Sequence, residues 1–203
     1  ECQHRITAVG GVEAILAAMR QHPLVPGLQE DGIESVLSLV CTLETASWIK
    51  LAAENSAEHR RALSTYAKVV DLGCVDTVLQ SIKTFLMSSS ICLRGIRLLR
   101  LLARAENNET KIARLGGLNI IFEAMKAHPV EADLHEQSCR ALSNLAMNDC
   151  NKARISELGG IEAILASMKL HAASPSVQQW ACGALANLAF NDRIEIKITR
   201  LGG

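Results

Sequence analysis

Apolar residues recur along the chain with the spacing of α-helices. In the segment GIEAILASMKLH, which starts at Gly160, the apolar residues Ile164, Leu165 and Met168 follow Ile161 by three, four and seven positions. This spacing places them on one face of a helix, which would pack against the rest of the protein. Hydrophobic residues make up 49% of the 203 residues but aromatic residues only 3%. A core of Ala, Leu, Ile, Val and Met suits close helix packing better than a sheet. We therefore predict an all-α fold.

The helical pattern repeats at a fixed interval. The segment KIARLGGLNIIFEAMKAHP starts at Lys111, and the similar segment RISELGGIEAILASMKLHA starts 43 residues later at Arg154. The same period separates the glycine pairs Gly116-Gly117, Gly159-Gly160 and Gly202-Gly203. Earlier copies place Gly10-Gly11 and Gly73-Cys74 in this position, and the longer distance between these two copies indicates an insertion of about 20 residues. The chain is therefore predicted to be a repeat array.

Each repeat is predicted to contain three helices. A short helix such as NKARISEL ends at the glycine pair, because glycine adopts left-handed backbone angles at a helix end without steric cost. A second helix such as GIEAILASMKLH follows. A polar turn, which contains Pro23, Pro129 or Pro175 in three of the copies, precedes a longer third helix such as LHEQSCRALSNLAM.

This arrangement resembles the armadillo repeat, over essentially the whole chain. The glycine pair between the first two helices and an asparagine late in the third helix are its most specific marks. The resemblance implies a right-handed superhelical solenoid of three-helix repeats that forms a single domain over residues 1–203. The units would span about 1–55 with the insertion, 56–105, 106–148 and 149–190, and a fifth unit would start at 191–203.

The resemblance also implies a concave groove lined by the third helices, in which asparagine side chains clamp the backbone of an extended peptide. The equivalent positions in the four units, with the residue one turn earlier given first, are Glu34/Ser38, Arg97/Leu101, Arg140/Asn144 and Gly183/Asn187. Two asparagines and no tryptophan occupy these positions, which argues against a basic nuclear-import signal as the ligand. The alternative is that Asn144 and Asn187 bond a neighbouring backbone group instead of a peptide.

Arginines and one tryptophan accompany these positions. Arg94, Arg97, Arg100 and Arg104 fall within an arc of about 120° on one helix, and Arg140 extends the row into the next unit. Such a stripe would suit carboxylates or phosphates. The alternative is a solvated face whose arginine stems cover apolar surface. Trp180 lies two turns before Asn187 and is either an anchor for a partner or part of the core.

Charge and cysteine content bear on partners and location. The 21 basic and 21 acidic residues balance, so general attraction to nucleic acid or to an anionic membrane is not indicated, although local patches are not excluded. Seven cysteines without a CxxC pair favour reduced, mostly buried thiols. We expect a cytoplasmic protein, with the nucleus as the alternative.

The motifs of common hydrolases, metalloproteases and nucleotide-binding enzymes are absent, and the dispersed histidines do not suggest a metal site or a cofactor.

These features predict a non-catalytic scaffold that binds an extended peptide or a partner helix, with a preference for acidic ligands. The candidate groove residues are Arg94, Arg97, Arg104, Arg140, Asn144, Trp180 and Asn187.

The alternative function is that of a structural spacer or self-assembling array within a larger multidomain protein, which contacts partners through its ends. Ile6 and Val9 at the start and Ile194, Ile196 and Ile198 at the end are the apolar residues expected to face neighbouring units. The insertion around Trp48 is expected to lengthen the third helix of the first unit.

Overall fold

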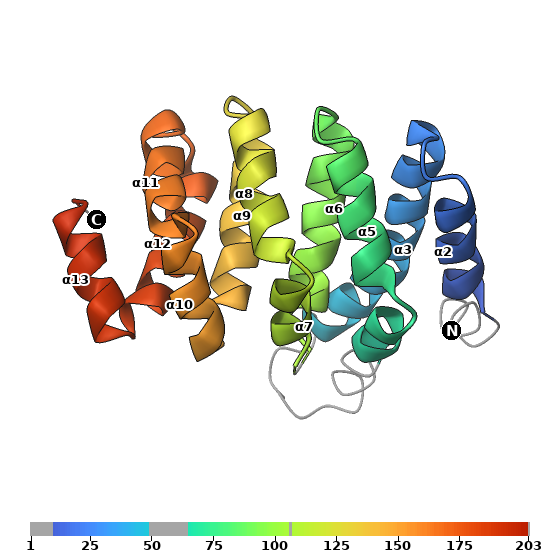
Figure 1. Ribbon diagram of the computed structural model, residues 1–203, viewed down its shortest axis with the longest axis horizontal. Helices are drawn as coiled ribbons and strands as arrows, with labels where there is room; N and C mark the ends of the chain where they lie inside the picture. Colours follow the sequence, from blue (N-terminus) through green and yellow to red (C-terminus); the bar gives the residue numbers. More distant parts are fainter. Residues whose placement is uncertain (1–9, 49–64, 106, 203) are drawn as a thin grey trace.

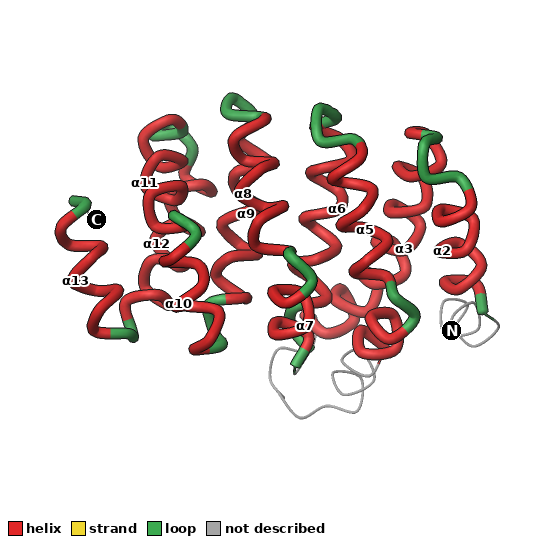
Figure 2. The backbone as a smooth tube through the Cα atoms, viewed as in Figure 1, coloured by secondary structure: helices red, strands yellow, loops and turns green. Residues whose placement is uncertain are grey.

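The described residues fold as helices joined by short turns. The computed structural model describes residues 10–48, 65–105 and 107–202, and all regular structure in these ranges is helical (Figure 2), as predicted. The helices are α2 (Gly11–Gln21), α3 (Pro26–Trp48), α5 (Cys74–Thr84), α6 (Ser89–Leu102), α7 (Asn108–Arg114), α8 (Gly117–Ala127), α9 (Ala132–Leu145), α10 (Asp149–Glu157), α11 (Gly160–Leu170), α12 (Pro175–Ala189) and α13 (Asp192–Arg200). Residues 65–71 are also helical. Ile6, Val9 and residues 49–64 of the insertion lie outside the described residues.

The helices stack in chain order along the long axis of the molecule (Figure 1). Helices α3, α6, α9 and α12 pack side by side, each against the next, and α2, α5, α8 and α11 form a second row beside them. Apolar side chains fill the space between the rows. Among the fully buried ones are Ile33, Ile82, Leu99, Ile121 and Ile161. Helix α3, with 23 residues, is longer than α6, α9 and α12, as the position of the insertion predicts.

The two glycines of each pair have different roles. Gly116 and Gly159 have φ angles of 92° and 78°, in the left-handed region where a side chain is strained, and they reverse the chain between two helices. The second glycine of the pair lies where neighbouring atoms leave no room for a Cβ atom, as at Gly117 and Gly160. A Cβ atom on Gly160 would lie 2.8 Å from the carbonyl oxygen of Ile155 and 2.7 Å from the ring of Phe122. The glycine pair is thus needed both for backbone geometry and for the contact between the first and second helices.

A polar residue near the start of the third helix ties it to the end of the second. Gln178 Nε2 donates to the carbonyl oxygens of Met168 at 2.8 Å and His171 at 3.1 Å. In the first unit, Gln29 at the equivalent position makes the same two contacts with the equivalent carbonyls. The Met168 carbonyl lies in the last turn of α11, where no further amide of that helix reaches it, and the carbonyl of His171, just after the helix, also accepts from the turn amide of Ser174. The side chain therefore completes the helix end and fixes the turn.

The end of the array differs in part from expectation. Ile194 and Ile198 of α13 are buried, with 4% and 7% of their surface exposed, because they pack within the chain. We expected these two residues to be exposed for a neighbouring unit, and this expectation is wrong. Ile196, which is 51% exposed, does face solvent.

None of the described helices combines the length and the apolar character needed to cross a membrane.

Two glycine-to-alanine substitutions test the close-packing role. Gly160→Ala should lower the free energy of unfolding by about 1–3 kcal/mol, because the added methyl group collides with the Ile155 carbonyl. Gly183→Ala is the matched control, since its Cβ would lie 3.8 Å from the nearest atom, Ser143 Oγ. It should be neutral or stabilise the fold by up to about 1 kcal/mol, because alanine is the better helix former. Urea unfolding curves measure both. Equal destabilisation by the two variants would contradict this account.

Candidate functional site

The candidate residues lie on three neighbouring helices. Arg94 and Arg97 belong to α6, Arg140 and Asn144 to α9, and Trp180, Gly183 and Asn187 to α12. Because α6, α9 and α12 pack side by side, equivalent positions in successive units lie next to one another. We call the face that carries these seven residues the third-helix surface. Arg104 follows the end of α6 and is exposed.

Both asparagines bond the backbone of the preceding third helix. Asn144 Nδ2 donates to the carbonyl oxygen of Arg100 at 3.0 Å. Asn187 Nδ2 donates to the carbonyl oxygen of Ser143 at 2.9 Å and to its hydroxyl at 3.1 Å. The two acceptors, like the two donors, are 43 residues apart in the sequence. Of the two alternatives considered from sequence, the bond to a neighbouring backbone group is the one observed.

The ends of the third helices explain why these carbonyls accept. In a continued α-helix, the amide of Arg104 would donate to the carbonyl of Arg100, but here it donates to Leu101 O at 3.2 Å. In the next unit, the amide of Met147 donates to Asn144 O at 3.2 Å and not to Ser143 O. The tightened last turn leaves one carbonyl without its own amide. A buried backbone oxygen needs a partner, and the asparagine of the next unit provides it.

The asparagines keep hydrogen-bonding capacity for a ligand. Each amide group has two N–H donors and an acceptor oxygen, and the bonds described above use the donor side. Both side chains are partly exposed, and Oδ1 has no hydrogen-bond partner among the described residues. Each Oδ1 is therefore available to an N–H group from outside.

The arginines do not form the continuous stripe that the helical wheel predicted. Arg100 is only 7% exposed, so it does not share the surface of its neighbours. Arg94 is engaged with α3, through Glu34 Oε2 at 2.6 Å and Glu30 Oε1 at 3.2 Å. Arg97, by contrast, is exposed and has no ion-pair partner in the described part of the chain. The positive charge of this surface is thus carried mainly at Arg97.

Arg140 and Trp180 form a pair across α9 and α12. The guanidinium carbon of Arg140 lies 4.4 Å from the centre of the Trp180 ring, in the geometry of a cation–π contact. Arg140 Nη1 also lies 3.3 Å from Glu136 Oε1. Trp180 is partly buried and packs against the core. The contact orients the Arg140 side chain, and the tryptophan keeps part of its surface exposed to solvent.

Sequence reasoning missed the acidic partners of Arg94 and the acceptor role of Ser143. Glu30 and Glu34 lie 64 and 60 residues before Arg94, and only the packing of α3 on α6 brings them together. A usable signal was present, because Glu34 occupies the repeat position of Arg97 and thus had to lie on the adjacent helix. Ser143 offered no such signal, since its carbonyl depends on the tightened end of α9.

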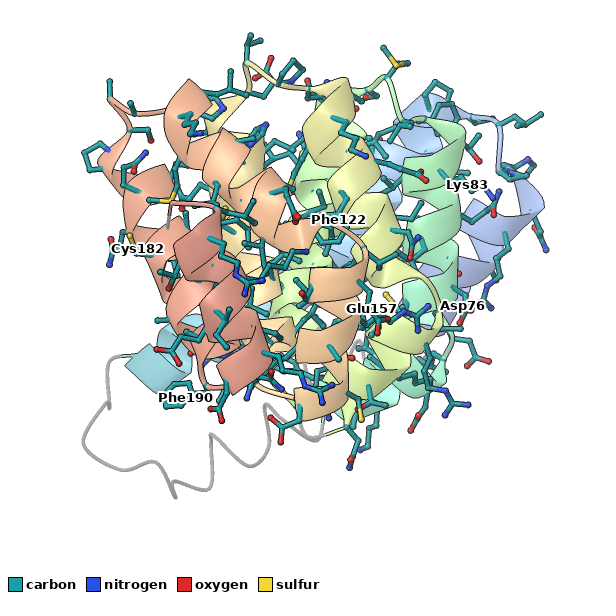
Figure 3. The ribbon with its side chains drawn as sticks, turned by 60° about the vertical axis from the view of Figure 1, so that its left-hand side comes forward. Asp76, Lys83, Phe122, Glu157, Cys182 and Phe190 are labelled. Atoms are coloured by element: carbon teal, nitrogen blue, oxygen red, sulfur yellow. The ribbon has the colours of Figure 1, made fainter. Side chains whose placement is uncertain are left out.

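The described residues give no arrangement suited to metal or thiolate chemistry. Within them, no group of three His, Cys, Asp or Glu side chains is placed to hold a metal ion. Burial raises the pKa of Cys74 and of Cys139 to about 12 and that of Cys92 to about 11. These thiols therefore stay protonated near neutral pH and are poor nucleophiles. Cys182 is exposed on α12, about two helical turns before Phe190, which follows the end of that helix (Figure 3).

The chain shows limited similarity to known proteins, both in sequence and in fold. No family model matches the chain. A segment of 110 residues, 54% of this chain, is 34% identical to Protein aardvark of Dictyostelium discoideum. That match covers 13% of the relative, so the chain spans a small part of its length. Among solved structures, the crystal structure of an engineered protein aligns with a TM-score of 0.57 and 19% identity, over 92% of this chain and 83% of that one. This likeness concerns the fold and supports the all-α class.

Replacing the two asparagines tests their role within the fold. Asn144→Ala and Asn187→Ala should each lower the free energy of unfolding by about 1–3 kcal/mol, because a backbone carbonyl loses its donor. Asn144→Asp should cost at least as much, since its carboxylate would face the Arg100 carbonyl oxygen. Asn119→Ala is the control, because Asn119 is exposed on α8 and should change stability by less than about 0.5 kcal/mol. Urea unfolding measures all four. Wild-type stability in the first two variants would refute the assigned role.

Proposed function

We propose that this chain is an armadillo-type array, a right-handed superhelical solenoid, that acts as a non-catalytic protein-interaction scaffold. Its ligand is an extended peptide with acidic side chains, bound along the third-helix surface. The observation that carries the proposal is the exposed Arg97, which has no internal partner in the described chain, beside the oriented Arg140.

Two features support the armadillo-type array. The first is the 43-residue period, with a left-handed glycine at the same point of each unit, including Gly73, Gly116 and Gly159. The second is the hydrogen bond from Asn144 and from Asn187 to the third helix of the preceding unit. Both features belong to the link between successive units, and a solenoid is stabilised by such links.

The polar groups of the third-helix surface suit an extended acidic chain. Oδ1 of Asn144 and Oδ1 of Asn187 can each accept from a peptide N–H while their Nδ2 atoms hold the helix carbonyls. Arg97 offers a planar fork of donors to a carboxylate. Gly183, between Gln179 and Asn187 on α12, has no side chain to extend from this surface, and a Cβ there would only make ordinary contact with Ser143 Oγ at 3.8 Å. The absent side chain suits the approach of a peptide backbone to α12.

A reducing location and the lack of catalysis are parts of the same proposal. The five cysteines within the described side chains are unpaired, and Cys74, Cys92 and Cys139 are buried. Unpaired buried thiols are typical of proteins of the cytoplasm or nucleus. Because their pKa values are raised by burial, these cysteines also give no support to a thiol-dependent enzyme.

Charge reversal on the third-helix surface tests the proposal. The probe is a fluorescein-labelled peptide of alternating Glu and Ser, titrated with protein and followed by fluorescence anisotropy. Arg97→Glu with Arg140→Glu should weaken binding by at least about tenfold, because each charged hydrogen bond contributes about 1.5–3 kcal/mol.

The matched control is Arg114→Glu with Arg154→Glu, which changes net charge equally at exposed residues of α7 and α10. It should bind the peptide almost as well as the wild type, and a Lys/Ser peptide should not bind either protein tightly. Equal losses in both double variants, with intact helical circular dichroism, would contradict a ligand site at the third-helix surface.

A second candidate function, self-association through the C-terminal end, rests on one observation. A cavity of about 640 Å³ opens at this end between α11, α12 and α13, lined by apolar residues such as Met168, Leu185 and Ile198. Ala186 lines the same cavity and is exposed. A second copy stacked on this end would cover apolar surface, which is favourable in water.

Light scattering over a concentration series tests this second function. The mass of the wild type should rise with concentration, and Ala186→Arg should keep the protein monomeric because the larger charged side chain blocks the cavity. Ala153→Arg, at an exposed alanine of α10, is the control and should associate like the wild type. A monomeric wild type at all concentrations would rule this function out.

A further inference from the structure

We propose that one edge of the array binds the surface of an anionic lipid membrane. This edge, which we call the loop rim, consists of the turns between second and third helices together with the last turn of each second helix. Its apolar tips are Leu24, Met87, Val130 and Ala173, and its basic residues are Arg20, Lys83, Lys126 and Lys169. The rim is distinct from the third-helix surface, which lies along the sides of α6, α9 and α12.

The apolar tips are the most exposed part of the rim. Leu24 is 76% exposed, Met87 80% and Val130 82%, and all three occupy the same position of their repeats. Leu170, next to the fourth turn, is 62% exposed. Exposed apolar residues also recur at equivalent positions elsewhere, as at Met147 and Phe190, so what distinguishes the rim is the basic residue that precedes each tip. Figures 1 and 2 show that the four turns lie at the same edge of the molecule.

A row of basic residues accompanies the tips. Each of them stands four residues before its tip, in the last turn of α2, α5, α8 or α11. Figure 3 shows Lys83 toward this end of α5 and Asp76 toward the other end. Lys83, Lys126 and Lys169 are exposed and have no ion-pair partner among the described residues. Their ammonium groups are therefore available to external anions.

The other charged groups near the rim do not cancel this row. Arg20 donates to Thr77 Oγ1 and to the carbonyls of Leu72 and Gly73. It therefore contributes positive charge, but its guanidinium group is not free to extend toward a ligand. Glu30 is occupied by Arg94 and Ser90. Glu131 and Asp133, which follow Val130, are exposed acids without an ion-pair partner in the described chain. These two acids offset part of the charge of the four basic residues, so the rim keeps a positive formal charge although the whole chain carries no net charge.

The geometry favours a lipid surface over a partner protein. A protein interface usually has a contiguous, well-packed apolar core, whereas these tips project outward singly, one from each turn. A bilayer interface accepts separate apolar projections, and its anionic headgroups attract lysines that lie about one helical turn farther back. Helix dipoles place partial charges of both signs here, because the second helices end and the third helices begin at the rim, and a basic residue lies in the last turn of each second helix.

Co-sedimentation with vesicles tests this proposal. The whole chain is mixed with vesicles of phosphatidylcholine containing about one-third phosphatidylserine, or with pure phosphatidylcholine vesicles. The wild type should sediment with the anionic vesicles at low salt, bind pure phosphatidylcholine at least about tenfold more weakly, and dissociate as salt is raised. Lys83→Glu, Lys126→Glu and Lys169→Glu combined should weaken binding by about 100-fold or more, since each lysine near the surface contributes about fivefold.

Matched variants separate the rim from a general charge or apolar effect. Arg114→Glu, Arg154→Glu and Arg193→Glu combined change net charge by the same amount at exposed residues of α7, α10 and α13, and should bind within about threefold of the wild type when both are compared at about 0.1 M salt, where charges more than about 10 Å from the lipid are screened. Leu24→Ser, Met87→Ser and Val130→Ser combined should weaken binding by at least about tenfold. Met147→Ser with Phe190→Ser, at exposed residues after α9 and α12, should not.

Three outcomes would overturn the proposal. One is no sedimentation of the wild type with anionic vesicles at low salt. Another is an equal loss in the rim and control charge variants, with the fold intact by circular dichroism. The third is tight, rim-dependent binding of an acidic amphipathic peptide by a wild type that ignores vesicles, which would assign the rim to a protein partner.

Discussion

The contacts between α6, α9 and α12 depend on how α6 and α9 end. The last turn of each tightens so that one carbonyl, at Arg100 in α6 and at Ser143 in α9, is not reached by an amide of its own helix. The asparagine of the next unit donates to that oxygen, at 3.0 Å and 2.9 Å. A buried carbonyl without a donor costs about as much as the loss of a hydrogen bond, so the ends of α6 and α9 each require the next helix. The packing of apolar side chains holds the rows together, and this bond fixes the register of α9 on α6 and of α12 on α9.

The same constraint shapes the surface that a ligand would meet. Asn144 and Asn187 are oriented by their bonds to the preceding helix, and their acceptor oxygens are therefore presented in a fixed direction. Arg140 is likewise oriented by its contact with Trp180. A surface whose polar groups are already ordered loses less entropy when it binds an extended chain. The structural and the proposed binding roles of the asparagines are thus compatible, because they use different atoms of one side chain.

The helices and turns could be predicted from sequence because local backbone chemistry determines them. Contacts between distant segments could not be predicted in this way. The glycine pairs and the 43-residue period predicted the turns at Gly116 and Gly159, because left-handed backbone geometry is required by the residues themselves. The burial of Arg100 could not be predicted, since a helical wheel does not show which edge the next helix covers. The neutralisation of Arg94 by Glu30 and Glu34 depends on how α3 packs on α6. The burial of Ile194 and Ile198 likewise depends on the packing of α13 within the chain.

The most direct test of the inter-unit bond is NMR spectroscopy of the asparagine side chains in isotopically labelled protein. The account predicts a scalar coupling through the hydrogen bond between Asn187 Nδ2 and the carbonyl carbon of Ser143, and a second one between Asn144 Nδ2 and the carbonyl carbon of Arg100. It also predicts that these side-chain amides exchange with solvent more slowly than that of the exposed Asn119. Exchange of all three at the same fast rate, with no coupling to either carbonyl, would contradict it.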